Sequence, residues 1–539
     1  MVFRTVRKTL AVIGAASLVG ALALTNPAQA ASNNNSVRKL TKAVTLGGVL
    51  RHEIAFQAIG SLSGGNRGSG LVGYDRSADY VATLLRLAGY EVTRQPFSFN
   101  FFEEFGSAFE QVSPNPTVYE EGVTYSLADY SGSADVTAAV VPVDLALDPP
   151  RTSTSGCEAG DFDPAVVTGK IVLLQRGGTN CSFGLKVANA QAAGAVAAIL
   201  MNQGNGTPEA NPDRYNLLLP TLGAPAAIPA VGVSYATGEA LANTPGLTVR
   251  IMADTTSEVR QTENVIAESR GGDATDVVMA GAHLDSEPDT VGINDNGSGS
   301  AALLEVALQM ARTKTPNKTR FAWWGAEESN LVGSTYYVGQ LTPAQRSDIA
   351  LYLNFDMIAS PNYILGVYDG DDSAGQGSPA GPPGSAEIEA VFQDFFADRG
   401  LPTRAADFTG RSDYGPFIAA GVGIPAGGLF TGAEVLKTAE DVADYGGVEG
   451  EQYDPCYHDP CDSLFPVRNG ADAALYAELD RQYDMLGNLN LEALDVNSDA
   501  MATAILTFAL DTSALPERPT TAAARSSAGP AYVGKEGSI

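Results

Sequence analysis

From Glu263 onward, short apolar segments of strand type alternate with longer segments that have helical spacing. Strands are expected at 264–267, 277–282, 320–324, 351–355 and 364–367, and helices at 299–311, 385–399 and 499–509. This alternation predicts an α/β fold with a mostly parallel central sheet flanked by helices, because parallel strands need a crossover between them. In such sheets functional side chains gather at the carboxyl edge.

The pattern changes between residues 106 and 256. Short apolar segments at 138–143, 170–174, 195–201 and 228–233 are separated by Gly, Pro and Asn, with one helix candidate at 182–193. None of the chain's three histidines falls in this region. A chain of 539 residues is too long for one ordinary core. We therefore expect a small β-rich insertion at 106–256, between residues 38–105 and 257–511 of a larger domain.

The ends of the chain differ in character from the middle. Basic residues at positions 4, 7 and 8, an apolar run over 10–24 and Ala28-Gln29-Ala30 are typical of a secretory signal peptide over 1–30. The apolar run falls short of the ~20 residues of a spanning helix. We expect a polar leader at 31–37, a secreted, extracellular protein, and a flexible tail at 512–539, which is rich in Pro, Ala, Thr, Ser and Gly.

Charge and cysteine content narrow the partners and the compartment. Lys and Arg number 33 against 62 Asp and Glu, which argues against nucleic acid and anionic membranes as partners. We expect a monomer. Four cysteines allow three connectivities, and their separation favours the local pairs Cys157–Cys181 and Cys456–Cys461 in an oxidising compartment. Ca²⁺ binding stays open, since no EF-hand-like loop is present.

Histidines and acids follow three of the predicted strands. His283 and Asp285 follow 277–282, Glu327 and Glu328 follow 320–324, Asp356 follows 351–355, Asp295 precedes the helix at 299–311, and His458 lies between Cys456 and Cys461. A single Asp at a strand end is usually a cap or a turn former. Here two of the three histidines coincide with these acids in one half of the chain, which favours a site.

The residue types in this set point to a pair of metal ions. Zinc binds imidazole nitrogen and carboxylate oxygen, and a catalytic site leaves one position for water. Two imidazoles and three carboxylates are too many for one open tetrahedral site. They suit two Zn²⁺ ions that activate a shared water, and Asp295, on the turn before a helix, is the expected bridging ligand.

Five segments, in order, resemble the secreted bacterial di-zinc aminopeptidase family. They are His283–Asp285, Asp295–Gly299, Trp324–Glu328, Asn354–Asp356 and Cys456–His458. The resemblance spans about 37–105 and 263–511, and implies the zinc exopeptidase fold. Residues 169–178, with Cys181 and 182–202, resemble the protease-associated domain, a small non-catalytic module found beside several peptidase types.

The family resemblance also implies a role for each ligand. His283, Asp295 and Asp356 would hold one zinc ion, and Glu328, His458 and again Asp295 would hold the other.

Further residues are implied to act around the two zinc ions. Glu327 would be the general base, and Tyr457 would hydrogen-bond the oxyanion. Asp285 would accept the ring N–H of His283.

Two more segments resemble parts of the family's substrate site. Residues 410–417 make Arg411 a candidate substrate contact, with a structural salt bridge as the alternative. Residues 429–432 make Phe430 a candidate wall of a pocket for apolar side chains, with core packing as the alternative.

The sequence thus predicts an aminopeptidase that removes N-terminal, large apolar residues from peptides with a free N-terminus. A carboxypeptidase of the same superfamily is the alternative, but it would add a helical dimerisation region, for which about 50 residues after His458 leave little room. A non-catalytic relative that binds peptides or proteins without metal is a third interpretation. Glutaminyl cyclisation, with one zinc, is a fourth.

Overall fold

The computed structural model describes residues 33–517, so the expected signal peptide and most of the expected tail lie outside the described residues. The chain divides into two compact units, one formed by the residues up to Phe97 and from Thr262 on, the other by Ser98–Gln261. Two long strands, β1 (Glu91–Ser113) and β8 (Thr248–Glu268), begin in one unit and end in the other. The bounds 106–256 expected for the insertion stay a prediction. None of the described helices is long and apolar enough to cross a membrane.

The larger unit is built on a mixed sheet with a parallel centre. Its strand order is β13 (Arg404–Ala406), β12 (Gly366–Tyr368), β14 (Ala426–Phe430), β11 (Ile349–Phe355), β9 (Asp273–His283), β10 (Asn317–Trp324) and the end of β8. Strand β9 runs parallel to both β10 and β11, and β14 runs parallel to β11. Strands β8 and β12 pair antiparallel to β10 and β14.

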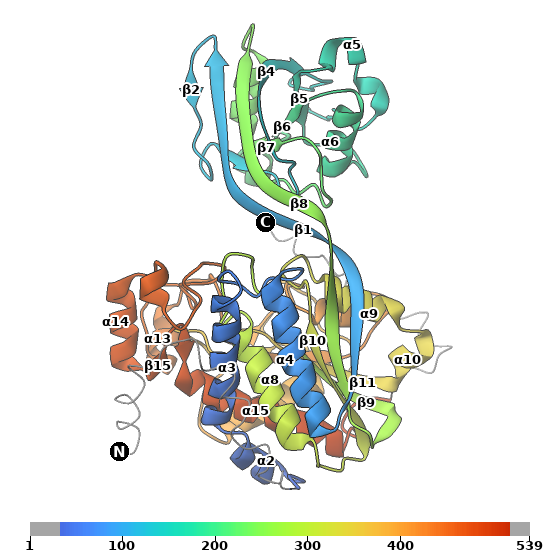
Figure 1. Cartoon of the computed structure of the whole chain (residues 1–539), viewed down its shortest axis with the longest axis vertical. Helices are drawn as coiled ribbons and strands as arrows, with labels where there is room; N and C mark the ends of the chain where they lie inside the picture. The colour runs from blue at the N-terminus through green and yellow to red at the C-terminus, as the bar shows by residue number, and fades with distance from the viewer. Residues whose placement is uncertain (1–32, 518–539) are drawn as a thin grey trace. The chain divides into compact units, whose positions relative to one another are not determined.

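Helices cover both faces of this sheet, as Figure 1 allows the reader to follow. The elements are α2 (Val37–Ala43), α3 (Leu46–Ser61), α4 (Val72–Ala88), α8 (Gly297–Met310), α9 (Val332–Gln340), α10 (Pro343–Asp348), α11 (Ser385–Ala397), α12 (Gly415–Ile418), α13 (Ala439–Tyr445), η4 (Pro466–Asn469), α14 (Ala473–Gln482), α15 (Leu491–Leu510) and the hairpin of β15 (Met485–Leu486) with β16 (Leu489–Asn490). Helices α3, α4 and α8 lie side by side.

Alternation along the central strands explains the two helical layers. Phe321 and Trp323 of β10 pack into a core with α3, α4, α8, α11 and α15, whereas Ala322 and Trp324 pack into a second core with α9 and α12. Successive side chains of a strand point to opposite faces, and a parallel sheet buries both of them. The predicted α/β class with a mostly parallel sheet is confirmed.

The smaller unit is built mainly from short strands and short helices. It contains β2 (Thr117–Val118), β3 (Tyr125–Leu127), β4 (Ala134–Pro142), β5 (Ile171–Gln175), β6 (Ala197–Met201), β7 (Ala230–Val233), α5 (Pro164–Val167), α6 (Phe183–Ala192), α7 (Tyr235–Ala242), η2 (Ala159–Asp161) and η3 (Pro212–Arg214). Strands β4, β5, β6 and β7 are parallel neighbours in that order, and β3 pairs antiparallel to β7. Both expected disulfides are present, Cys157–Cys181 in this unit and Cys456–Cys461 in the larger one.

Candidate metal centre

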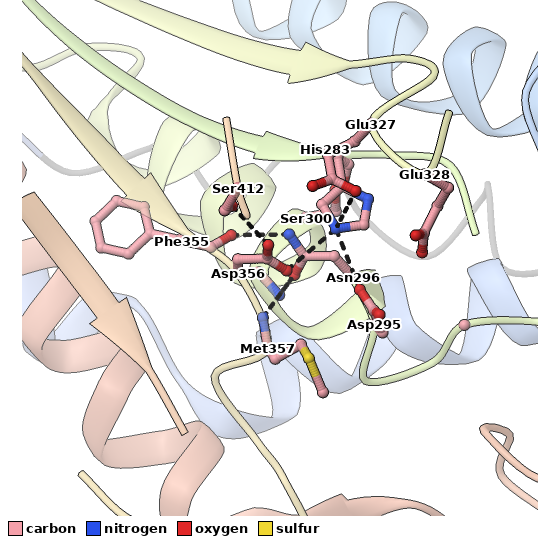
Figure 2. Close-up of polar contacts among 12 residues, drawn as sticks. His283, Asp295, Asn296, Ser300, Glu327, Glu328, Phe355, Asp356, Met357 and Ser412 are labelled. Atoms are coloured by element: carbon pink, nitrogen blue, oxygen red, sulfur yellow. Dashed lines mark hydrogen bonds and ion pairs between the residues drawn. The ribbon is translucent and has the colours of Figure 1, made fainter. Parts of the chain in front are cut away.

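Three neighbouring strands deliver the predicted ligands to one edge of the larger sheet. Because β9 lies between β10 and β11 and runs parallel to both, the carboxyl ends of the three strands meet. His283 is the last residue of β9, Glu327 and Glu328 follow β10, and Asp356 follows β11. Figure 2 shows their side chains converging on one small volume.

The turn before α8 brings Asp295 to the same edge. Asn296 caps α8, and its side-chain oxygen accepts the N–H of Gly299 at 3.0 Å and of Met357 at 3.2 Å. Its amide donates to the carbonyl of Phe355 at 2.9 Å. A Cβ on Gly299 would lie 2.3 Å from that same carbonyl oxygen, so only glycine allows so close an approach. The start of α8 is thereby held against the residues on either side of Asp356.

Asp295 faces both imidazoles, one with each carboxylate oxygen. Oδ1 lies 3.2 Å from Nε2 of His283, and Oδ2 lies 3.4 Å from Nε2 of His458. Each imidazole also faces a second acid, because Nε2 of His283 is 3.1 Å from Oδ1 of Asp356 and Nε2 of His458 is 3.3 Å from Oε2 of Glu328. The structure thus brings together the five residues that the sequence predicted as ligands.

In this cluster the effect of neighbouring charges on the pKa values outweighs the effect of burial. Burial works against the protonated ring of His283, but the charges of Asp356 and Glu327 outweigh it and raise the pKa of His283 well above its usual value. Glu328 and Asp295 likewise overcome burial and raise the pKa of His458. Burial also opposes the charged form of Asp295, yet the two histidines beside it lower its pKa to about 2. A buried group with more acids than imidazoles attracts cations.

The donor atoms fit zinc. Nε2 of His458 is buried and makes no hydrogen bond within residues 33–517, although two carboxylate oxygens lie 3.3 and 3.4 Å away. A buried nitrogen that is close to oxygens without pointing at either of them is placed as a metal ligand would be. Imidazole nitrogen and carboxylate oxygen are the ligands that zinc takes in catalytic sites.

Glu327 lies at the edge of this cluster. Its side chain is buried, and Oε2 is 4.0 Å from Nε2 of His283. Glu327 also forms a compact group with His283 and Asp356, whose ligand atoms all lie within 4.8 Å of one another. Distance alone therefore does not separate a base from a ligand here.

Asp285 faces the ring of His283 with both its backbone carbonyl and its carboxylate. Nδ1 of His283 is 3.1 Å from the backbone carbonyl oxygen of Asp285 and 3.7 Å from its carboxylate, so the carbonyl is the nearer acceptor. The carboxylate instead accepts the backbone N–H of Glu327 at 3.3 Å and of Glu328 at 3.4 Å. Asp285 thus orients both the ring of His283 and the turn that carries the two glutamates.

Arg411 and Tyr457 form one side of the site. Nη1 of Arg411 donates to Oε1 of Glu434 at 2.5 Å, and Nη2 donates to the hydroxyl of Tyr457 at 3.3 Å. The ring of Tyr457 stacks on that of His458 with 3.8 Å between centroids. Phe430 is partly buried and packs against the second core of the larger unit. Arg411 therefore makes a salt bridge and also reaches the site through Tyr457.

Two supporting residues were not predicted from the sequence. Ser412 donates to Oδ2 of Asp356 at 2.6 Å and accepts from Asn354 at 2.8 Å. Asp462 accepts the backbone N–H of Asp295 at 2.9 Å. Its place directly after Cys461, in the turn that carries His458, was the available hint. Such outer contacts orient ligands and tune their basicity.

Imidazoles and carboxylates that converge at the carboxyl edge of an α/β sheet form a candidate metal site. Comparison with known proteins identifies the class of protein. Residues 264–478 match peptidase family M28, and residues 136–241 match the PA domain. The chain is 43% identical to an aminopeptidase of Pseudomonas aeruginosa over 468 residues, which cover 86% of this chain and 81% of that one. It is also 43% identical to leucine aminopeptidase 2 of Trichophyton rubrum, over 68% of this chain and 67% of that one.

Solved structures share the fold. An aminopeptidase from an Aneurinibacillus species superposes with a TM-score of 0.58 and 24% identity, over 87% of this chain and 95% of that one. A zinc aminopeptidase from Bacillus subtilis gives a TM-score of 0.51 and 22% identity, over 90% of this chain and 97% of that one. The chain belongs to peptidase family M28 and carries a PA domain.

Proposed function

We propose that this protein is a secreted, zinc-dependent aminopeptidase that works with two metal ions. The observation that carries the proposal is the position of Asp295, whose two oxygens lie 3.2 and 3.4 Å from the Nε2 atoms of two different histidines. A carboxylate that faces two imidazoles in this way is suited to bridge two ions. The curated relatives named above are aminopeptidases, which supports the reaction class.

The ligands would divide into two sets around this bridge. His283 and Asp356 would complete one zinc site, and His458 and Glu328 the other, each together with Asp295. When bound, the two ions would lower the pKa of a shared water and polarise the peptide carbonyl.

Three residues of the chain would do the proton transfer and the oxyanion stabilisation. Glu327 takes the proton of the attacking water and returns it to the leaving amine. Its side chain is buried beside the proposed ligands, which suits this role. The hydroxyl of Tyr457 accepts a hydrogen bond from Arg411 and would donate its own proton to the developing oxyanion. Asp285 keeps Glu327 in place through the backbone.

The substrates would be peptides with a free N-terminus and a large apolar first residue. The acidic rim around His458, which includes Glu287 and Asp289, suits a positively charged α-amine. Trichophyton relatives are named leucine aminopeptidases, which supports an apolar preference, and Phe430 is the candidate wall of the pocket. Arg411 remains a candidate contact for the substrate beyond the first residue.

Secretion and the monomeric state complete the proposal. The signal-like N-terminus and the two disulfides support an extracellular location. Calcium binding stays open. The acids Asp369, Asp371 and Glu389 lie close together, but backbone N–H groups donate to all three.

Three matched peptides would test the function. An unblocked peptide, an N-acetylated one and a C-amidated one are each incubated with the protein, with and without a chelator. An aminopeptidase cleaves the unblocked and amidated peptides, spares the acetylated one, and stops when the chelator is added. Cleavage of the acetylated but not the amidated peptide would establish the carboxypeptidase alternative, and no cleavage at all would favour a binding protein.

A further inference from the structure

The two histidines of the centre are held very differently. His283 ends a central strand, its side chain is 1% exposed, and Nδ1 faces the carbonyl of Asp285 at 3.1 Å. His458 lies in the turn closed by the Cys456–Cys461 disulfide, has a positive φ of 58° and a side chain that is 33% exposed. The orientation of the His458 ring therefore depends on neighbouring side chains, of which the stacked ring of Tyr457 is one.

Glu287 is another of these neighbours. Its Oε1 lies 3.6 Å from Nδ1 of His458, on the side of the ring opposite to Nε2, which faces Asp295 and Glu328. We propose that Glu287 is a positioning residue for His458. At 3.6 Å its carboxylate makes an ion-pair contact rather than a hydrogen bond, and its negative charge would favour the tautomer with the proton on Nδ1, so that Nε2 carries the lone pair toward the zinc site. This inference rests on the proposed metal centre.

The chemistry of this contact follows a general rule for metal-binding histidines. A carboxylate or carbonyl on the second ring nitrogen fixes the tautomer and raises the basicity of the first. The loop after β9 would then serve both rings, the carbonyl of Asp285 for His283 and the side chain of Glu287 for His458. One short segment would thus orient the two imidazoles of the centre.

Buried groups other than the side chain of Glu287 hold the backbone on both sides of it. Arg67 is fully buried and donates to the carbonyl oxygens of Val291 at 2.8 Å and Gly292 at 2.7 Å, and also to that of Leu284. Ser286 accepts the backbone N–H of Arg67 at 3.0 Å. These bonds lie on both sides of Glu287. A substitution of its 28% exposed side chain should therefore leave the loop in place.

A different role for the same residue would be docking of the substrate's α-amine. Glu287 belongs to an acidic rim, and its oxygen lies within 4.8 Å of ligand atoms of Glu328 and His458. The contact with Nδ1 favours positioning, because an acid that faces this ring nitrogen acts on the metal before any substrate arrives. The two roles differ in what they do to zinc affinity in the absence of peptide.

The experiment compares Glu287→Ala, Glu287→Gln and, as a matched control, Asp459→Asn. Asp459 is an exposed acid adjacent to His458, so its replacement removes one negative charge from the rim without touching the Nδ1 contact. Zinc affinity of each purified protein is measured by competition with a chromophoric chelator in the absence of substrate. Visible spectra of the Co²⁺-substituted proteins report on coordination, and thermal unfolding checks the fold.

If Glu287 positions His458, Glu287→Ala should lower the affinity for one of the two zinc ions by about 10- to 100-fold and alter the Co²⁺ spectrum. Glu287→Gln should recover part of the loss, because its amide oxygen can still face Nδ1, and Asp459→Asn should match the wild type. Unchanged zinc affinity in a folded Glu287→Ala protein, with only KM raised, would overturn the proposal in favour of amine docking. An equal loss of zinc affinity in Asp459→Asn would show that Glu287 acts only through the negative charge of the acidic rim, which would also overturn the proposal. If the wild type itself binds fewer than two zinc ions, the proposed metal centre fails instead.

Discussion

Both units of the chain contain parallel strands with a core on each face, and in both units polar side chains stand at the carboxyl ends of those strands. In the smaller unit these side chains form hydrogen bonds with backbone groups. Gln175, at the end of β5, accepts the backbone N–H of Ala146 at 2.8 Å and donates to the carbonyl oxygen of Gln203 at 2.8 Å. Asn202, after β6, donates to two backbone carbonyl oxygens at 2.9 Å. In the larger unit the corresponding residues are a histidine and acids that face one another.

The difference shows that position at a sheet edge is not sufficient for a site. Neutral amides at strand ends satisfy buried backbone groups, which is a structural task. Histidine and several carboxylates in one volume leave a net charge that the backbone does not neutralise, and that charge selects a cation. The amides of the smaller unit therefore stabilise the fold, whereas the histidines and acids of the larger unit form the candidate metal site.

Asp295→Ala should have the largest effect, because it removes the residue shared by both imidazoles. We expect loss of both zinc ions and a fall in activity of at least about 10⁴-fold, since activation of water and oxyanion stabilisation are lost together. Metal analysis and peptide hydrolysis measure this. Gln175→Ala in the smaller unit is the contrasting control. It should cost about 1–3 kcal/mol of stability and leave zinc content unchanged. Full activity in Asp295→Ala would contradict the view that the strand ends of the larger unit, unlike those of the smaller one, form a metal site.

Glu327→Ala should come next. Loss of a general base lowers kcat by about 10²–10⁴-fold, while two zinc ions stay bound. Glu328→Ala, one residue along the chain, should instead lose zinc from one site. Paired zinc analysis and kinetics on the two variants check the assignment. If Glu327→Ala releases zinc, Glu327 is a ligand, as its group with His283 and Asp356 would also permit.

Tyr457→Phe removes only a hydroxyl group and should have a smaller effect. We expect kcat to fall by about 10²–10³-fold with zinc content unchanged, the range found for a single oxyanion donor. Arg411→Met keeps that hydroxyl and should lower kcat less than Tyr457→Phe does. Steady-state kinetics on an unblocked peptide separates kcat from KM. An effect of Tyr457→Phe on KM alone would assign the residue to substrate binding.

The smallest effect concerns a buried charge of the smaller unit. Burial lowers the pKa of Lys186 to about 8, against about 10.4 in an unfolded chain. Between these values the unfolded state binds more protons than the folded one. The stability of the unit should therefore rise with pH across that window, by about 1–2 kcal/mol.

Urea unfolding at pH 7.5 and pH 10 measures the slope. Lys186 donates to the carbonyl of Ser155 and lies beside Cys157, so its role is structural. Lys186→Met should flatten the slope and leave peptidase activity unchanged at pH 7.5. A variant that loses activity while it stays folded would show that the buried charge of this unit also serves the chemistry.

Local patterns predicted much of this protein. Alternating apolar segments placed β9, β10 and β11, because the period of a strand or helix is written in neighbouring residues. Helix α15 begins at Leu491 rather than at 499, since Asn490 caps it by accepting the N–H of Glu492 at 3.1 Å and of Ala493 at 3.1 Å. The Cys456–Cys461 disulfide also followed from short separation along the chain.

The sequence by itself determined most of the elements, the residue types of the candidate site and the family, because these depend on residue chemistry and on spacing along the chain. Only the tertiary structure decided which atom faces which. The two oxygens of Asp295, the carboxylate of Asp285 behind Glu327, and Glu287 behind His458 all depend on distances of 3 to 4 Å between segments far apart in the chain. Such distances are set by the packing of the whole domain, which no local pattern encodes.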